Sequence, residues 1–508
     1  MKPTLMSLGM VTVLLALSAR QAAAATTTYE AEDATRTAGV VEANHAGFTG
    51  TGFVDYDNAV GSSVRFDVLV ATAGQHALVF RFANGTTADR AMAIAVNGTV
   101  VDASMSFPGT GAWTSWTTKI LRVQLRAGAN VIATTATTGN GGPNLDSLVV
   151  DTETNVPPPA DWSRAVVDST MARRSATSLG LGYTDALFLY GAHLVYRRTH
   201  EPRYLDYIKA WGNARVQADG STGNAYNDLD SMLAGNIFLI LAQETGENRY
   251  RLAAARIRQR LDTYPRTTDG GVIHNTNFRG QLWADGVFMA QPFVARYGVQ
   301  FNDSSYGFNE STRQIITYFN HLKDENGLLH HAYDELRQQS WANPTTGRSP
   351  EVWCRAVGWF GVATVDLLEI LPAGHQNRTE LINIVRHLAE LYRQWQDPAS
   401  GRWFQLPARP TLAGNWTETS CSSMYTYTVA RAVQRGYVDS SYSQVVAKGY
   451  QGVMEKVSIG SDGRSNIADI CTGTSVGDAP YYLNRPRATN EIHGIGPFLI
   501  MNEQRLAP

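Results

Sequence analysis

Carboxyl side chains lie beside aromatic residues in the C-terminal part of the sequence, a pattern suited to acid–base chemistry on a sugar. Residues 283–286 read Trp-Ala-Asp-Gly, so Asp285 stands between a tryptophan and a glycine, and residues 227–230 read Asn-Asp-Leu-Asp. A positioned carboxyl can give or take a proton, and a glycine lets backbone or ligand approach closely. The alternative interpretation of each acid is a helix N-cap, for which Asp is a preferred residue.

An arginine lies between two tryptophans in residues 353–359, Trp-Cys-Arg-Ala-Val-Gly-Trp. Arg355 and Trp359 are four residues apart, so a helix places them on one face. A guanidinium pairs with a carboxylate and an indole packs against a sugar ring, which together suit a sugar that carries a carboxylate. The alternative is a cation–π pair within the fold.

Other kinds of chemistry find no support in the sequence. His330 and His331 are adjacent, and in an extended segment their side chains point to opposite sides. No His-x-x-x-His or Cys-x-x-Cys spacing indicates a zinc site. There is no P-loop, no dinucleotide glycine fingerprint and no Gly-x-Ser-x-Gly turn. Carboxylate chemistry on a carbohydrate, without a catalytic cofactor, is what remains.

Helices are expected to position these segments, because the hydrophobic period after residue 161 is helical. Residues 199–204 (Thr-His-Glu-Pro-Arg-Tyr) and 245–250 (Thr-Gly-Glu-Asn-Arg-Tyr) match at four of six positions, 46 residues apart. Each lies between two helical stretches, so the repeated unit is a helical hairpin. Repeated hairpins over residues 161–508 predict a closed toroid of paired helices.

Residues 26–151 have a different pattern, with period two and frequent turn signals, which predicts a β-sandwich. Asn97-Gly98 separates two apolar runs and predicts a tight hairpin turn. Residues 152–160 contain three consecutive prolines and are interpreted as a stiff linker between domains. With 508 residues, two or three domains are expected.

The first 25 residues have the layout of a secretory signal peptide: a lysine, a short apolar run and a series of small residues. We therefore expect a secreted protein, extracellular or periplasmic, whose mature chain begins near Thr26. A net charge of −2 offers no field to hold nucleic acid or an anionic membrane. The sequence does not indicate an oligomeric state. Cys354, Cys421 and Cys471 allow at most one bridge, and we interpret Cys354 and Cys421 as buried free thiols in preference to a bridge or a nucleophile.

Three acids lie near the two ends of the predicted sandwich. If its terminal strands are adjacent, Glu30, Glu32 and Asp146 converge on a hard cation, for which calcium suits all-oxygen ligation. The alternative is three surface acids.

The region resembles a family 35 carbohydrate-binding module, a jelly-roll β-sandwich, in residues 29–32 (Tyr-Glu-Ala-Glu), 49–54, 81–84 and 144–146. The resemblance implies a structural calcium on those three acids and an acidic sugar as ligand. Its candidate sugar-binding residues are Trp113, Trp116, Asn140 and Asn144. The alternative for either tryptophan is a place in the core.

The acidic and aromatic segments of the helical region, taken in order, resemble glycoside hydrolase family 105, the unsaturated rhamnogalacturonyl hydrolases. The matching segments are residues 283–290, 331–335, 353–359 and 418–420, with later matches at 471–477 and 493–496. The resemblance implies an (α/α)6 toroid. It also implies removal of a 4,5-unsaturated uronic acid, left by a polysaccharide lyase, through hydration of the double bond.

The same resemblance implies roles for individual residues. Asp285 is the proton donor, with Asp230, preferred to Asp228, as the second acid. A donor needs a pKa raised toward the working pH, and a carboxylate at Asp230 is expected to keep Asp285 protonated. The residues that orient the sugar or shape its pocket are His331, Arg355, Trp283, Trp359 and Met289.

Other functions stay open at this stage. Another toroidal enzyme, an inverting glycosidase or a polysaccharide lyase, acts on similar polymers, and an inverting enzyme needs two opposed carboxyls. A non-catalytic binding protein is a third interpretation. Rhamnose of pectin is the default aglycone of the family, with glucuronide-ending substrates as the alternative.

Overall fold

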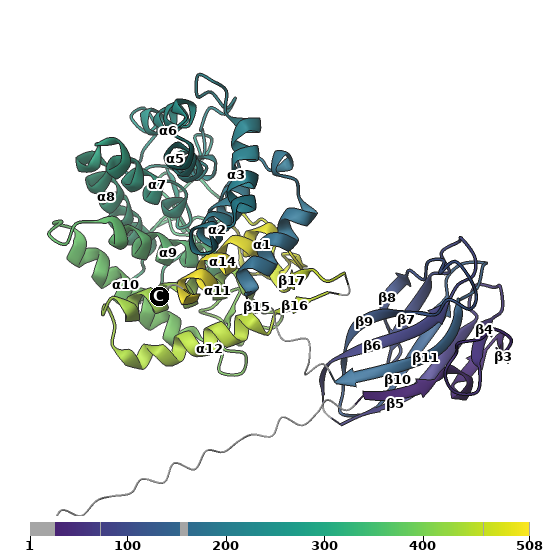
Figure 1. Ribbon diagram of the computed structural model, residues 1–508. Helices are drawn as coiled ribbons and strands as arrows, with labels where there is room; N and C mark the ends of the chain where they lie inside the picture. The colour runs from purple at the N-terminus through teal and green to yellow at the C-terminus, as the bar shows by residue number, and fades with distance from the viewer. Residues whose placement is uncertain (1–25, 72, 153–160, 461, 507–508) are drawn as a thin grey trace, which may run out of the picture. The chain divides into compact units, whose positions relative to one another are not determined.

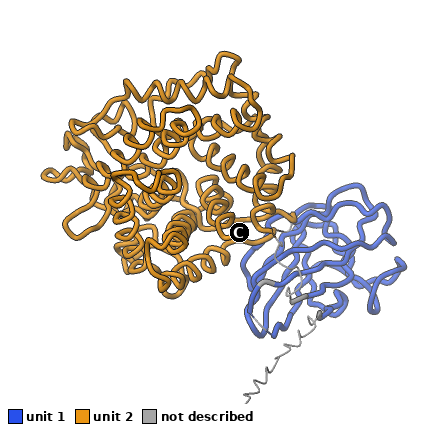
Figure 2. The backbone as a smooth tube through the Cα atoms, turned by 60° about the vertical axis from the view of Figure 1, so that its left-hand side comes forward, with its two compact units in different colours: residues 1–158 blue, residues 159–508 orange. Residues whose placement is uncertain are grey.

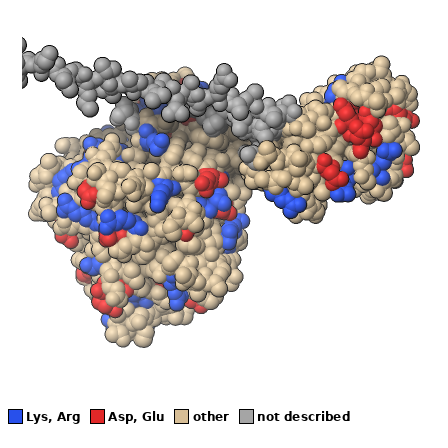
Figure 3. Space-filling model, turned by 90° about the horizontal axis from the view of Figure 1, so that it is seen from below, with Lys and Arg blue, Asp and Glu red and all other residues tan. Residues whose placement is uncertain are grey.

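The computed structural model describes residues 26–71, 73–152, 161–460 and 462–506. The chain divides into two compact units, residues 1–158 and 159–508 (Figures 1 and 2). The predicted signal peptide and residues 153–160 of the predicted linker lie outside the described residues. In the space-filling view, basic and acidic side chains both occur on the visible face of the larger unit (Figure 3).

The first unit is a β-sandwich, as predicted. One sheet runs in the order β3 (Gly39–Glu42), β4 (Phe53–Tyr56), β11 (Asn144–Thr152), β6 (Gly74–Ala83) and β9 (Thr117–Leu125), with β1 (Thr26–Glu30) pairing β11. The other runs β2 (Thr35–Thr37), β5 (Ser63–Val70), β10 (Gly128–Ala136), β7 (Met92–Val96) and β8 (Thr99–Met105). Burial alternates along β5, so every second side chain enters the core between the sheets.

The predicted hairpin turn at Asn97-Gly98 is confirmed. It joins β7 to β8, and both residues have positive φ, 51° and 83°. Asn and Gly tolerate that conformation better than other residues.

The second unit is helical. Its inner helices are α2 (Tyr183–Thr199), α5 (Gly235–Thr245), α7 (Gly286–Phe301), α9 (Cys354–Ile370), α11 (Thr419–Gln434) and α14 (Ile492–Leu506). Each packs against the next, and α14 packs against α2, so the contacts return to their starting point.

An outer helix packs against each inner one, and several of them lie at the rim in Figure 1. The outer helices are α3 (Pro202–Arg215), α6 (Asn248–Arg260), α8 (Ser304–Leu322), α10 (Arg378–Trp395), α12 (Ser443–Met454) and α1 (Trp162–Arg173). Within the described ranges, no helix has the length and apolar character that crossing a membrane requires.

The two segments that match in sequence form equivalent turns, one between α2 and α3 and one between α5 and α6. The residue after each inner helix, His200 or Gly246, is left-handed. In both turns a threonine hydroxyl, of Thr199 or Thr245, donates to a carbonyl of the preceding helical turn. An arginine also lies over the next tyrosine in each outer helix: Arg203 over Tyr204 and Arg249 over Tyr250. The prediction of repeated hairpins is confirmed at these two turns.

Short turns close the hairpins, whereas long segments lead into the inner helices. Residues 200–201, 246–247 and 302–303 are the turns of three hairpins, but residues 261–285 precede α7 and 323–353 precede α9. The long segments carry the small elements α4 (Leu229–Met232), α13 (Ala479–Leu483), β12 (Gln281–Trp283), β13 (Ala332–Asp334), β14 (Trp403–Phe404), β15 (Thr417–Glu418), β16 (Val457–Ile459), β17 (Ser465–Ile467), β18 (Ile470–Cys471) and β19 (Arg487–Ala488). Each outer helix brings the chain back to the end from which the preceding inner helix began. All the inner helices therefore start at the same end of the unit.

Glycine permits the closest approach between the first and last inner helices. A Cβ on Gly191 of α2 would lie 2.7 Å from Leu499, and a Cβ on Gly496 of α14 would lie 2.4 Å from Leu187. At each of two neighbouring contacts, a glycine of one helix therefore packs against a leucine of the other.

Candidate active site

Asp230 and Asp285 come together at the starts of the inner helices. Asp285 immediately precedes α7, and Asp230 lies in α4. Together with His274, they bring one carboxylate or imidazole atom each to within 4.8 Å of one another. The Nε2 of His274 lies 3.7 Å from Oδ1 of Asp230. Two acids widely separated in sequence thus form one site.

The structure separates the roles of the neighbouring acids. Asp228 is a helix N-cap, since its carboxylate accepts the backbone N–H of Ser231 at 2.8 Å. Asp230 points into the site with 34% of its side chain exposed. Asp285 occupies the N-cap position of α7 but makes no capping hydrogen bond. The capping alternative therefore holds for Asp228 and for neither of the other two.

Aromatic rings surround the carboxyl pair. Trp283 stacks on His274, with ring centroids 4.3 Å apart, and its indole N–H donates to Gln281 at 3.0 Å. Trp359 stacks on Phe288 at 4.5 Å. Both tryptophans are more than nine-tenths buried, and the expected pocket residue Met289 is fully buried in α7. Met289 is part of the hydrophobic core at this position.

Tyr183 and His493 contact each other beside Trp359, where the first and last inner helices meet. Tyr183, the first residue of α2, packs edge-on against Trp359 and against the ring of His493 in α14. Tyr183 lies outside the matching segments and His493 begins the last of them, so their meeting depends on the contact between α2 and α14.

His331 lies on the other side of Asp285. It is fully buried, and its Nε2 is 3.7 Å from Oδ1 of Asp285. Its Nδ1 is 2.6 Å from the hydroxyl of Tyr482 in α13. The structure thus places His331 beside Asp285, while its expected role of orienting the sugar stays a prediction; Tyr482 is a partner that the motifs did not indicate.

The two acids have opposite pKa shifts, and the expectation for Asp285 is wrong. Burial raises the pKa of Asp230 to about 6, with help from the charges of Asp285 and Asp228. Burial also acts to raise the pKa of Asp285, but the imidazoles of His331 and His274 outweigh it and lower that pKa. Below about pH 6 the carboxyl that retains its proton is therefore Asp230, while Asp285 is ionised.

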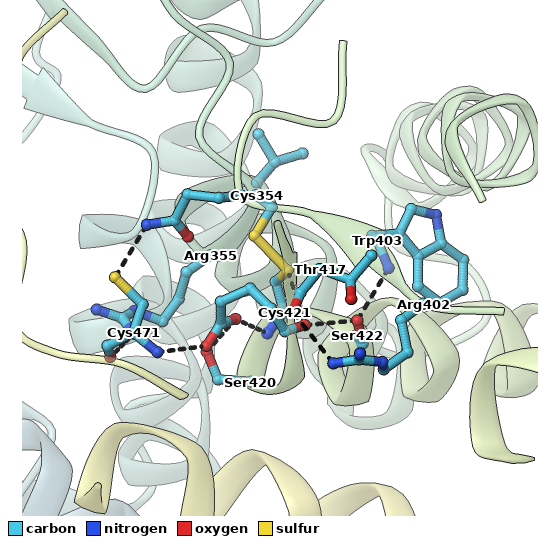
Figure 4. The surroundings of a disulfide bond; sticks show 12 residues. Cys354, Arg355, Arg402, Trp403, Thr417, Ser420, Cys421, Ser422 and Cys471 are labelled. Atoms are coloured by element: carbon cyan, nitrogen blue, oxygen red, sulfur yellow. Dashed lines mark hydrogen bonds between the residues drawn. A yellow bond between two sulfur atoms is a disulfide. The ribbon is translucent and has the colours of Figure 1, made fainter. Parts of the chain in front are cut away.

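Arg355 lies beside a different indole from the expected one. Its guanidinium is 4.7 Å from the ring of Trp353, in place of Trp359. It is fully buried and donates to the carbonyls of Cys471 at 2.5 Å and Thr472 at 2.7 Å, while its Nε has no partner. Two carbonyls thus hold the arginine in place at the start of α9 (Figure 4).

The interpretation of Cys354 and Cys421 as free thiols is wrong. They form a disulfide that joins the first residue of α9 to the first turn of α11 (Figure 4). Cys471 is the free cysteine, and it is buried. The sulfurs of Cys354 and Cys421 also lie within 4.8 Å of a carboxylate oxygen of Glu418, but the disulfide removes them as metal ligands. The bond fixes the helix end that carries Arg355.

Each of the three acids of the β-sandwich contacts residues 49–52, and Asp146 also pairs with the guanidinium of Arg81 at 2.5 Å. The hydroxyl of Thr49 lies 2.9 Å from Glu30 and 2.8 Å from Asp146. Glu32 accepts the backbone N–H of Thr51 at 2.6 Å, while its Oε2 is buried without a partner. Burial raises the pKa of Glu30, and the charges of Glu32 and Asp146 raise it further. A buried carboxylate oxygen without a partner, beside two further carboxylates, suits a hard cation.

The expected sugar-binding residues of the sandwich lie in different surroundings. Trp113 and Trp116 are both half-buried, and each ring has an arginine guanidinium 5.2 Å away. Asn140 is exposed in a loop, whereas Asn144 is buried at the start of β11. The two tryptophans and Asn140 are accessible to a ligand, and Asn144 is much less so.

Comparisons with known proteins match both units. The family model of Glycosyl Hydrolase Family 88 matches residues 162–506, and that of Carbohydrate binding module (family 35) matches residues 27–152. A family 105 glycoside hydrolase from C. acetobutylicum is 33% identical with a TM-score of 0.65, over 68% of this chain and 99% of that one. A family 88 glycosyl hydrolase from Bacteroides vulgatus is 18% identical with a TM-score of 0.53, over 68% and 97% of the two chains, which is a likeness of fold alone.

Two proteins with curated descriptions are also similar to parts of the chain. Protein Atu3128 of Agrobacterium fabrum is 31% identical over 234 residues, 43% of this chain and 98% of that protein. Exo-beta-D-glucosaminidase of Amycolatopsis orientalis is 53% identical over 122 residues, which is 24% of this chain and 12% of the length of that enzyme. The resemblances that the motifs indicated are confirmed at the level of the two families.

The disulfide predicts a thiol count. Unfolded without reductant, the protein should expose one thiol per chain, that of Cys471, and three after reduction. A colorimetric thiol titration in denaturant measures both values. The Cys471→Ser control should give none before reduction and two after it; three thiols in the unreduced wild type would contradict the disulfide.

The opposite pKa shifts predict opposite effects of two isosteric changes on stability. A raised pKa at Asp230 costs stability once pH exceeds the ordinary aspartate value of 3.8, and the cost is complete above about 6. Asp230→Asn should therefore raise the melting temperature at pH 7.5 by about 1–3 °C, with a smaller gain at pH 4.5. Calorimetry at the two pH values measures it.

Asp285→Asn is the matched comparison. A lowered pKa contributes stability at every pH above 3.8 and loses it only as pH falls further. This variant should melt below the wild type at both pH 7.5 and pH 4.5. Shifts of the same sign in the two variants would contradict the assignment of the proton to Asp230.

Proposed function

The chain belongs to glycosyl hydrolase family 88 and carries a family 35 carbohydrate-binding module, and we propose that it is a secreted enzyme that removes a 4,5-unsaturated uronic acid from the non-reducing end of lyase-generated oligosaccharides. The observation that carries the proposal is the close pair of Asp230 and Asp285, with opposite pKa shifts, between aromatic walls. Environments that push two neighbouring pKa values apart are typical of acid–base sites.

The spacing of the two carboxyls is shorter than conventional inversion requires. Their oxygens lie within 4.8 Å, whereas an inverting glycosidase separates its carboxyls by roughly 6.5–9.5 Å to admit a water. A 4,5-unsaturated uronic acid is an enol ether. Protonation at C4 and addition of water at C5 give a hemiketal, which opens and releases the aglycone. No second carboxyl is required on the opposite face of the ring.

We assign the proton transfer at C4 to Asp285, with Asp230 as the group that stores the proton in the free enzyme. The substrate brings a carboxylate of its own, and a like charge raises the pKa of both acids. The pair therefore keeps its shared proton to a higher pH with substrate bound than in the free protein. After transfer, the carboxylate of Asp285 faces the Nε2 of His331 and the start of α7, both of which favour its charge. It can then take a proton from the incoming water.

The starts of the inner helices supply the rest of the binding site. Their partial positive charge favours a uronate, and Arg355 adds a buried guanidinium whose Nε is unpartnered. Trp283 and Trp359 form the buried backing of the site's walls, stacked on His274 and Phe288. The closed series of helix contacts from α2 to α14 supports an (α/α)6 toroid as the frame.

The proposed aglycone is rhamnose, which makes rhamnogalacturonan fragments of pectin the substrate, with glucuronide-ending oligosaccharides as the alternative. The family 35 module is proposed to hold a structural calcium on Glu30, Glu32 and Asp146 and to bind an acidic cell-wall sugar at Trp113 and Trp116. Secretion is supported by the pattern of residues 1–25 and by the disulfide, since disulfides persist in oxidising compartments.

The test of the activity is the loss of ultraviolet absorbance from an unsaturated disaccharide made by rhamnogalacturonan lyase. The wild type should abolish the signal as the double bond is hydrated. Asp285→Asn should lower turnover at least roughly 10²-fold, the scale of general acid catalysis. Asp206→Asn is the matched control, because it changes an exposed acid on the outer helix α3 and should keep wild-type turnover.

The outcomes distinguish the alternatives. A flat signal on both rhamnose- and glucuronide-linked substrates would contradict the proposal, and a rise on intact polymer would identify a lyase. Near-normal turnover by Asp285→Asn would remove this residue from the proton transfer.

The proposed calcium site predicts a chelator effect. Removing calcium from the full-length protein should lower the melting transition of the sandwich by roughly 5–10 °C, since a ligand bound only to the folded state stabilises it. Differential scanning calorimetry with and without chelator measures the shift. Glu32→Gln should reduce it, while Asp67→Asn, an exposed acid on β5, should leave it unchanged. An unmoved wild-type transition would refute a resident cation.

A further inference from the structure

Tyr482 lies far from the acidic motifs in sequence but reaches the histidine beside Asp285. It belongs to the short helix α13, 151 residues after His331, and its hydroxyl is 2.6 Å from the Nδ1 of that imidazole. Its ring packs against Trp353, with centroids 5.8 Å apart. The contact is buried on both sides, since Tyr482 and His331 are each fully buried.

The backbone on both sides of the contact holds the imidazole in place. The N–H of His331 donates to the carbonyl of Glu351 at 3.0 Å, and its own carbonyl accepts the N–H of Ala284 at 2.8 Å. Ala284 is the residue before Asp285. His331 is therefore tied to the same backbone that carries the acid, and its two ring nitrogens have fixed neighbours.

The direction of the hydrogen bond follows from the other partner of the hydroxyl. The Tyr482 oxygen already accepts the backbone N–H of Gly477 at 3.2 Å. Burial raises the pKa of Tyr482, so the phenol keeps its proton. Among the described residues, the acceptor that this proton meets is the Nδ1 of His331. An imidazole that accepts at Nδ1 and is neutral carries its proton on Nε2.

The Nε2 nitrogen faces Asp285. It lies 3.7 Å from Oδ1, and both atoms are buried without a closer partner. Burial lowers the pKa of His331, which keeps the ring neutral; the charged or titratable groups that face it are Asp285, His274 and Arg355. A short movement on substrate binding would turn this approach into a hydrogen bond to the carboxylate.

We propose that Tyr482 is a positioning residue of this active site: its hydroxyl holds His331 in the tautomer that presents an N–H to Asp285. The inference rests on the proposed function for its catalytic consequence, but the tautomer itself does not. With the hydroxyl removed, the proton of the imidazole is free to move to Nδ1. A lone pair would then face Asp285 and oppose the carboxylate that proton transfer leaves behind.

The experiment compares Tyr482→Phe with Tyr481→Phe in the full-length protein. Tyr481 is the neighbouring tyrosine of α13, and its hydroxyl accepts the N–H of Ser475 without contacting His331. Tyr482→Phe should lower kcat roughly tenfold, on the scale of one lost hydrogen bond, with KM within about twofold. The pH–rate profile should move to higher pH, because Asp285 loses an N–H that favours its ionised form. Tyr481→Phe should match the wild type in all three.

The tautomer is read separately by ¹⁵N NMR of histidine-labelled protein, with the His331→Gln spectrum identifying the signal. The wild type should show a proton on Nε2, and Tyr482→Phe should lose that state in part or entirely. Wild-type kinetics and an unchanged tautomer in Tyr482→Phe would overturn the inference, as would equal losses in both tyrosine variants. An inactive wild type that shows the Nε2 proton would instead refute the proposed function and leave the tautomer assignment standing.

Discussion

The contact between the first and last inner helices is the constraint on which the site depends. Gly191 and Gly496 let α2 and α14 approach so closely that each receives a leucine of the other. Only with that contact made do Tyr183 and His493, more than three hundred residues apart in sequence, meet beside Trp359. The starts of all the inner helices then face one region, and the segments that lead into those helices bring Asp230, Asp285 and His331 there.

Within that frame, the carboxyls of Asp230 and Asp285 have opposite pKa shifts because their neighbours differ. At Asp230, burial and the neighbouring carboxylates outweigh the imidazole of His274 and favour the neutral form. Asp285 is placed at a helix start between two imidazoles, which favour its charge. Burial acts in the same direction on both, so it explains the raised pKa of Asp230 but not the lowered pKa of Asp285. The neighbours decide which acid holds the proton, and those neighbours come from four separate segments of the chain.

Local features were predictable from the sequence, and features that depend on distant contacts were not. The Asn97-Gly98 turn and the hairpin turns at Thr199 and Thr245 each follow from a few adjacent residues. The segments around Asp285, His331 and Arg355 indicated the family, because each is contiguous and they occur in the family's order. By contrast, the disulfide joins cysteines 67 residues apart. Such a spacing does not indicate whether two cysteines pair, so the bond could not be predicted.

The same limit applies to individual partners in the site. A helical period places Arg355 and Trp359 on one face, but it could not indicate that carbonyls from residues 471–472 would turn the guanidinium toward Trp353.

The difference in length between the short turns within hairpins and the long segments that lead into the inner helices has a consequence for how such a protein diversifies. Lengthening a surface loop costs little conformational entropy, about 0.6 kcal/mol for each doubling. Insertions can therefore accumulate at the catalytic end, where they alter which sugars fit, while the tight turns at the opposite end keep the helical scaffold unchanged.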